Sequence, residues 1–254
     1  MGKIIAFASG KGGVGKTSMA ANIGAALSLE NKKVLLIDLD IGLRNLDLML
    51  GLHSIMIYDL VDVYEKKVSL FEASYHFDKY GELYFLPASQ TIDKEDVNAE
   101  LFYNFISDIR EQFDFIILDC PAGIETGVKN ALCIADMLIC VVTPDSASLR
   151  DADRLIGVSE EYGVKERYVL VNRLNTKLVR KGAMPNLDEI LDNLGTSLIG
   201  IIIDEPMMVK YQNDGELALN SGSKKFAKNV KNCAKRLTGE EIPIKIKWKT
   251  ISSK

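Results

Sequence analysis

Eight residues near the start of the chain have the types and the spacing of a phosphate-binding loop. They read Gly10-Lys11-Gly12-Gly13-Val14-Gly15-Lys16-Thr17 and match the pattern G-x-x-x-x-G-K-[ST] between a strand-like run and a helical one. Glycines let the backbone wrap closely around a phosphate, with its N–H groups pointing inward. Lys16 is expected to contact the β- and γ-phosphates, and the Thr17 hydroxyl to bind Mg²⁺. A glycine-rich turn with a solvated lysine is the alternative, but the full match favours a nucleotide site from Gly10 through Ser18.

A second lysine, Lys11, stands near the start of this loop. A cation at that position can neutralise charge that develops on the γ-phosphate during transfer, either in its own site or across a dimer interface. A solvated side chain is the alternative on residue type alone.

Three aspartates follow two other strand-like runs. The run Phe115–Asp119 is apolar and ends in an aspartate, the arrangement that holds Mg²⁺ in P-loop proteins, commonly through a water. The run Lys33–Leu39 places Asp38 and Asp40 two residues apart and therefore on the same face. Two carboxylates there could steady the metal shell and orient an attacking water. A lone aspartate at a strand end is more often a turn former or a helix cap, but three of them beside a phosphate loop favour metal binding and catalysis.

The elements that must position these residues alternate along the chain. Short runs that are apolar on nearly every residue suit strands covered on both faces. The expected strands are Ile4–Ser9, Lys33–Leu39, Leu83–Pro87, Phe115–Asp119, Met137–Thr143, Tyr168–Asn172 and Leu198–Ile203. The expected helices are Thr17–Leu29, Leu101–Gln112, Ala147–Tyr162 and Leu187–Leu194. The alternation predicts an α/β fold with a doubly wound, mainly parallel sheet and helices on both faces, in which ligands bind beyond the carboxyl ends of the strands.

The composition fits one globular domain. The chain has 254 residues, of which 47% are hydrophobic and 26% charged, enough to bury a substantial core. No apolar run reaches the roughly 18 residues needed to span a bilayer, and the N-terminal apolar stretch is too short for a signal peptide, so we expect a cytoplasmic protein. The four cysteines lie without C-x-x-C spacing, which argues against a metal or redox role.

The C-terminal part is basic, whereas the whole chain has a net charge of −4. From Lys224 onward there are ten basic residues and two acidic ones, which points to an anionic partner. An apolar stripe with helical spacing is formed there by Phe226, Val230, Ala234 and Leu237. The simpler interpretation is a terminal helix docked on the core with a solvated basic face. Residues 244–254 alternate isoleucine or tryptophan with lysine, a period of two that does not predict a helix. We therefore expect an ATPase domain over 1–243 and a short basic tail over 244–254 that could adhere to anionic lipid.

The motifs resemble the deviant Walker A family of P-loop ATPases, and in particular its MinD branch. The resemblance rests on the loop with its extra lysine and on further stretches, and it runs from residue 3 to about residue 243. These stretches are Leu35–Asp47, Ile57–Val63, Leu86–Thr91, Asp119–Glu125 and Arg150–Arg154. The resemblance implies ATP or ADP and Mg²⁺ as cofactors, and a homodimer that forms with ATP.

The same resemblance implies roles for individual residues. Lys11 would contact the partner's nucleotide, Lys16 would contact phosphate, and Asp40 would position the hydrolytic water. Mg²⁺ would be bound by Thr17, Asp38 and Asp119. The adenine side would be formed by Asn172, Arg173 and Asp204, although the chain reads Ile203-Asp204-Glu205-Pro206 where the family usually has Pro-Glu-Asp. The segments Asp38–Asp47 and Asp119–Glu125 would be switches that ATP and ADP order differently.

The function implied by the resemblance is an ATP-driven dimerisation switch that helps to place the division septum. It would associate with an anionic membrane surface in the ATP state, recruit an inhibitor of the MinC type, and respond to an activator of the MinE type. Turnover is expected to be slow and stimulated by partners. The alternative is a ParA-like or flagellar-placement ATPase that binds DNA or another partner in place of membrane, and the MinD-like stretches argue against DNA. An iron–sulfur reductase component is the least favoured class, because the cysteine spacing offers no cluster site.

Overall fold

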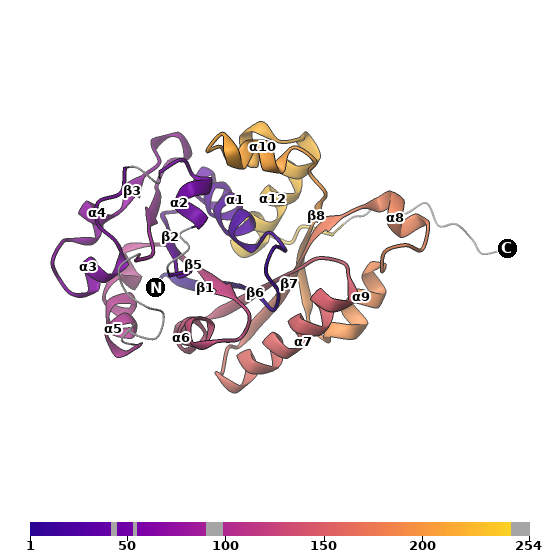
Figure 1. The fold of residues 1–254 in the computed structure, drawn as a ribbon, viewed down its shortest axis with the longest axis horizontal. Helices are drawn as coiled ribbons and strands as arrows, with labels where there is room; N and C mark the ends of the chain where they lie inside the picture. The colour runs from indigo at the N-terminus through magenta and orange to yellow at the C-terminus, as the bar shows by residue number, and fades with distance from the viewer. Residues whose placement is uncertain (42–44, 53–54, 90–98, 245–254) are drawn as a thin grey trace.

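In the part of the chain that the structure describes, eight strands form a mainly parallel sheet with helices on both of its faces (Figure 1). The computed structural model describes residues 1–41, 45–52, 55–89 and 99–244. The predicted α/β class and the doubly wound sheet are confirmed.

The strands lie in the order β3-β4-β2-β5-β1-β6-β7-β8, and the pairings are parallel except for the one between β3 and β4. Their bounds are β1 Lys3–Ser9, β2 Val34–Asp38, β3 Tyr75–His76, β4 Leu83–Leu86, β5 Phe115–Ala122, β6 Met137–Val142, β7 Glu166–Leu174 and β8 Ser197–Ile203. Each of the seven predicted strands is present, with shifts of a few residues at the ends. The two-residue β3 was not predicted, because so short a strand has no hydrophobic period to detect.

The helices divide between the two faces. Their bounds are α1 Lys16–Leu29, α2 Asn45–Met49, α3 Leu60–Tyr64, α4 Leu70–Ala73, α5 Ala99–Ile109, α6 Thr126–Ile134, α7 Ser146–Glu161, α8 Thr176–Arg180, α9 Leu187–Leu194, α10 Met208–Asn213, α11 Ala218–Ser221 and α12 Lys224–Leu237. Side chains of α3 to α9 share one group of buried apolar residues, whereas those of α1, α2, α11 and α12 share the other. The helix predicted over Leu101–Gln112 ends at Ile109 and continues as a 3-10 turn.

The helix α1, which carries the phosphate loop at its start, is buried around most of its circumference. It packs against the sheet on one side and against α12 on the other. The predicted stripe of α12 is buried, and Cys233 belongs to it as well. The expected docked terminal helix is therefore present as α12, and it packs against α1.

The loop between β1 and α1 lies where the carboxyl ends of β2, β5 and β1 meet. Among the described residues, no helix has the length and apolar character needed to cross a membrane. Lys245 to Lys254 of the predicted tail, residues 42–44 of the first predicted switch, and Gln90 and Thr91 of a MinD-like stretch lie outside the described residues.

Candidate functional site

The phosphate loop has the backbone conformation that its glycines permit. Gly13 and Gly15 have φ angles of +79° and +89°, in the region that side chains with a Cβ rarely adopt. A Cβ on Gly15 would lie 2.4 Å from the Asn172 side-chain nitrogen. That amide nitrogen donates a hydrogen bond to the Val14 carbonyl oxygen over 2.8 Å. The loop is thus held in shape by a residue at the end of β7.

The start of the loop rests against the backbone of α7. A Cβ on Gly10 would lie 2.3 Å from the carbonyl oxygen of Asp151, and real Cβ atoms do not approach a backbone atom so closely. Only glycine lets this loop pack on α7 without a shift of one of the two.

Replacing Gly10 with alanine is expected to lower the free energy of unfolding by about 1–3 kcal/mol, because the methyl group overpacks the contact with α7. Gly157 lies in the same helix with nothing within 4 Å of its Cβ position. Gly157→Ala is the matched control, and it should stabilise the protein by about 0.5–1 kcal/mol, since it removes a glycine from a helix interior. Urea unfolding of both variants measures the difference. A Gly10→Ala variant that is as stable as the native protein would contradict the close contact.

Lys16 and the predicted metal residues converge at one point. The Lys16 Nζ atom lies 2.6 Å from Asp119 Oδ1, and both side chains are more than nine-tenths buried. The same ammonium lies 3.3 Å from the Thr17 hydroxyl oxygen. Asp38 faces Asp119 across the β2–β5 pair and accepts a hydrogen bond from the Asp40 backbone N–H over 2.9 Å. The sheet therefore gathers these residues from three separate parts of the chain.

One lysine faces more than one buried carboxylate here. Burial and the neighbouring Asp119 carboxylate raise the pKa of Asp38 to about 8. Burial alone would lower the pKa of Lys16, but the Asp119 carboxylate outweighs it, so the pKa of Lys16 is raised. The ammonium is thus charged at neutral pH, and Asp38 ionises less readily than a free aspartate while no metal ion is bound. Oxygen ligands from two carboxylates and one hydroxyl suit Mg²⁺, which usually completes its shell with water and phosphate oxygens.

Lys11 does not join this cluster. Its side chain is about half exposed, and its Nζ atom lies 3.8 Å from a carboxylate oxygen of Asp145. Asp145 also caps α7 by accepting a hydrogen bond from the Ser148 backbone N–H, and it accepts another from the Thr143 hydroxyl. Asp145 was not predicted from the sequence; it follows β6, whereas Asp38 ends β2 and Asp119 lies within β5.

The residues predicted for the adenine side line a small pocket beside the phosphate loop. Asn172, Arg173 and Asp204 line it together with Gly15 and Ser18. Arg173 has a φ angle of +55°, and its backbone N–H donates to the Asn172 carbonyl oxygen Oδ1 over 2.9 Å. The structure brings these residues together with the phosphate loop, and their contacts to a base stay a prediction.

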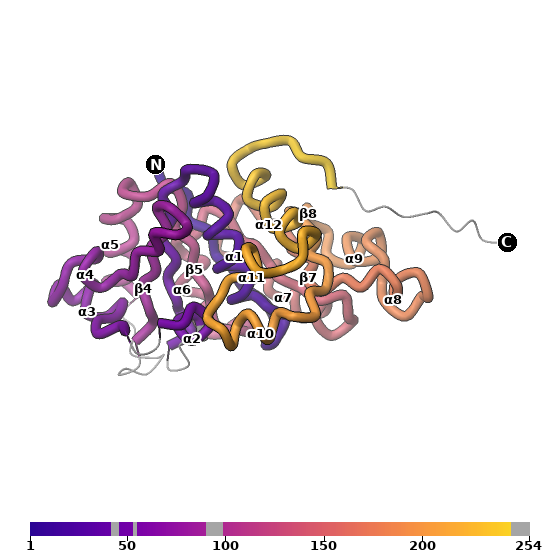
Figure 2. The backbone as a smooth tube through the Cα atoms, turned by 90° about the horizontal axis from the view of Figure 1, so that it is seen from above, coloured from indigo at the N-terminus to yellow at the C-terminus, as the bar shows by residue number. Residues whose placement is uncertain are grey.

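A further contact, with the first turn of α1, comes from α10, which lies beside α2 (Figure 2). The Gln212 amide nitrogen donates to the Ser18 hydroxyl oxygen over 2.5 Å and lies 3.6 Å from the Met49 sulfur. Asn22 continues the connection, since its amide donates to the Ser18 carbonyl and accepts from the Leu219 backbone N–H. No pattern in the sequence predicts Gln212, because it lies almost 200 positions from Ser18 and carries no motif of its own.

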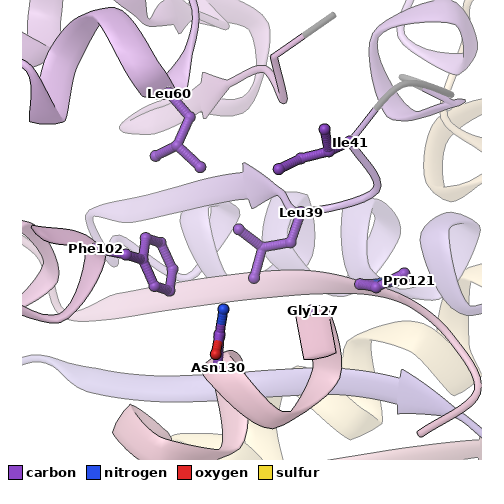
Figure 3. A pocket seen from close by; sticks show the side chains of 7 residues that line it. All are labelled: Leu39, Ile41, Leu60, Phe102, Pro121, Gly127 and Asn130. Carbon is purple, nitrogen blue, oxygen red and sulfur yellow. The ribbon is translucent and has the colours of Figure 1, made fainter. Parts of the chain in front are cut away.

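The two predicted switch segments meet at a small apolar pocket (Figure 3). Leu39 and Ile41 line it from the segment after β2, Pro121 lines it from the predicted segment Asp119–Glu125, and Gly127 lines it from α6. The remaining lining residues are Leu60, Phe102 and Asn130. The two predicted switch segments thus share one apolar contact region, which lies close in sequence to Asp38 and Asp119.

Comparison with known proteins finds the same fold and sequence pattern. Residues 2–170 match the family model described as an AAA domain. The septum site-determining protein MinD of Bacillus subtilis is 42% identical over 248 residues, which cover 97% of this chain and 92% of that protein. One chain of the MinC:MinD cell division protein complex from Aquifex aeolicus has a TM-score of 0.87 at 41% identity, with 96% of this chain and 98% of that one covered. The MinD of Pyrococcus horikoshii, complexed with Mg-ADP, has a TM-score of 0.80 at 26% identity, with 93% and 96% covered.

Proposed function

Because the chain belongs to the MinD family of P-loop ATPases, we propose that it is an ATP-driven dimerisation switch that helps to place the division septum. The observation that carries the proposal is the separation of the two loop lysines. Lys16 is buried beside Asp119, whereas Lys11 is half exposed and lies 3.8 Å from Asp145. One lysine is therefore positioned for its own site, and the other is available to a second molecule.

The buried cluster supports binding of a nucleotide with its metal ion. Lys16 would transfer its contact from Asp119 to the β- and γ-phosphate oxygens, which frees the Asp119 carboxylate. Thr17, Asp38 and Asp119 would then hold Mg²⁺, directly or through water. The ion would supply positive charge to the phosphates as charge develops on them. Asp40, two residues beyond Asp38, would orient the attacking water.

Lys11 gives a reason for dimerisation by ATP. A γ-phosphate carries charge that one site neutralises only in part, and Lys11 of a second copy would neutralise the rest. ATP binding would thereby select the dimer, and hydrolysis would release it. Slow turnover that a partner stimulates fits a switch whose ATP state must last long enough for the dimer to assemble.

The partners follow from the relatives. The Aquifex aeolicus structure is a MinC:MinD complex, so an inhibitor of the MinC type would be the first partner, with a MinE-type activator as a second. In the ATP state the dimer would associate with an anionic membrane surface, with residues 1–243 as the ATPase domain and 244–254 as a basic tail. A DNA-binding function is not proposed, because the Bacillus subtilis relative is named for septum-site determination.

Lys11→Ala is expected to abolish ATP-dependent dimerisation while nucleotide binding is retained. Light scattering after size exclusion, in Mg-ATP and in Mg-ADP, measures the mass. The native protein should be dimeric only with ATP, and Lys165→Ala, which changes an exposed lysine far from the loop, should behave like it. A Lys11→Ala variant that still dimerises with ATP would contradict the assignment of Lys11.

The cellular output is tested by sedimentation with vesicles of phosphatidylglycerol, with duplex DNA as the parallel ligand. Pelleting with vesicles in ATP and not in ADP would support the membrane-associated switch. Pelleting with DNA alone would overturn it in favour of the partition type of function.

A further inference from the structure

Within the residues that the structure describes, β8 forms one edge of the sheet, and a groove of about 600 Å³ lies beside it. The strand β8 pairs with β7 on one side and is the last strand in the order. Residues of α8 and α12 line this groove together with Ile242, Pro243 and Ile244. The groove is lined by Thr176, Arg180, Ile201, Ile203, Lys225, Lys228, Asn229, Asn232, Arg236, Ile242, Pro243 and Ile244. We call it the β8 groove.

The β8 groove is strongly cationic. Four of its lining side chains carry positive charge, namely Arg180 on α8 and Lys225, Lys228 and Arg236 on α12, and none of the described lining residues is acidic. The surface between them is apolar, since Ile201 and Ile203 of β8 line it together with Pro243. A ligand that fits must therefore combine negative charge with an apolar or neutral backbone.

The backbone edge of β8 is only partly used within the described part of the chain. The Arg236 guanidinium donates to the Ile199 carbonyl oxygen over 2.9 Å and to the Ile242 carbonyl oxygen over 2.8 Å. It thus holds the C-terminal segment beside the strand and occupies one acceptor of the edge. Asn229 also lines the groove, and its buried Oδ1 atom has no hydrogen-bond partner among the described residues. A buried acceptor without a donor is costly, and a rotation of the Asn229 side chain toward the groove, where a ligand N–H group could donate to it, would remove that cost.

We propose that the β8 groove binds an extended acidic peptide segment of another protein, which pairs with the edge of β8 and places its carboxylates between α8 and α12. Strand addition at a free edge is an established mode of peptide recognition, in which main-chain hydrogen bonds give affinity and side-chain pockets give specificity. Carboxylates match the four cations, and peptide N–H groups match the acceptors of the strand edge. This site lies apart from Lys16, Asp38 and Asp119, although Ile203 also lines the pocket predicted for the adenine side, and it goes beyond the proposed switch.

The positive charge of the β8 groove argues against two other occupants, a second copy of the chain and the C-terminal residues of the chain itself. A second copy of the chain would bring the same four cations to the edge. The residues that follow Ile244 include Lys245, Lys247 and Lys249, so they carry the same sign as the groove. An acidic partner removes this repulsion.

The test uses fluorescence anisotropy with a fluorescein-labelled peptide of five alternating valine and glutamate pairs. A second peptide has the same side chains but an N-methyl group on every residue, so it keeps the charge and has no N–H group to donate along a strand edge. The native protein should bind the first peptide at least about tenfold more tightly than the second.

Matched charge reversals locate the site. Arg180→Glu/Lys228→Glu changes two groove cations, and Lys177→Glu/Lys231→Glu changes exposed lysines on the same two helices that do not line the groove. The first pair should weaken binding by about tenfold or more, and the second by less than about twofold. Both double variants should keep nucleotide binding, which shows that they are folded and separates this proposal from the proposed switch.

Equal losses in the two double variants would overturn the proposal, because the attraction would then be unspecific. Equal binding of the N-methylated peptide would overturn the strand pairing. Binding of phosphatidylglycerol vesicles or duplex DNA that depends on Arg180 and Lys228, without binding of the peptide, would assign the groove to another ligand and overturn it as well.

Discussion

Replacing Lys16 with alanine is expected to lower the rate of ATP turnover by about 100-fold or more. An active site loses about this much when one preorganised hydrogen-bond donor is removed. The ammonium group is buried, charged and 2.6 Å from Asp119, so no water or neighbouring side chain can take its place without a rearrangement. Phosphate release at saturating Mg-ATP measures the loss.

Two controls accompany this measurement. Lys165→Ala removes an exposed lysine and should leave turnover within about twofold, since surface substitutions away from a site have small effects. Lys16→Arg keeps a positive charge but presents a planar fork in place of a compact ammonium, so its activity should stay far below that of the native protein. Turnover by Lys16→Ala within tenfold of the native rate would show that the buried ammonium is not the group that acts on phosphate.

Replacing Asp38 with asparagine is expected to flatten the dependence of stability on pH in the protein without nucleotide and Mg²⁺. Burial and the Asp119 carboxylate raise the pKa of Asp38 to about 8 in the folded state, against about 3.9 in an unfolded chain. Between these values the folded state binds more protons than the unfolded one, so the free energy of unfolding falls as pH rises. From pH 5 to pH 8 the native protein should lose about 2–4 kcal/mol through this group, and the variant should not.

Urea unfolding at pH 5, 6.5 and 8 gives the comparison. Asp153→Asn, which changes an exposed carboxylate in the middle of α7, should keep the native slope. The Asp38→Asn variant should also lose Mg²⁺-dependent ATP turnover, because it removes one proposed metal contact. Parallel pH profiles for native and Asp38→Asn protein would mean that Asp38 is already ionised in the folded state.

The phosphate loop and its setting were predictable because their requirements are local. Glycine at position 15 is needed for a φ angle that other residues rarely adopt, and the flanking strand and helix have short hydrophobic periods. The strand-end aspartates follow the same logic, since parallel strands place their carboxyl ends at one edge. The sequence therefore predicts the sheet, the loop and the cluster of Lys16, Asp38 and Asp119 that the structure contains.

Other contacts of the site could not be predicted because they join distant segments through side chains alone. Gln212 reaches Ser18 and Asp145 reaches Lys11, and neither pair has a fixed spacing. The clash between a Gly10 Cβ and Asp151 depends on how α7 packs against the loop. Such contacts follow from the tertiary arrangement, in which one helix shift of an ångström would remove them.

The two edges of the sheet, at β3 and at β8, affect how readily the protein aggregates at high concentration. One edge ends in the two-residue β3, too short to template a further strand, and at the other Arg236 occupies the Ile199 carbonyl among like charges. Unprotected strand edges are the usual starting points of aggregation, and short strands and cations are the usual safeguards. Molecules crowded together should therefore resist forming insoluble β-assemblies. The proposed dimer, which rests on Lys11, would then form away from the sheet edges.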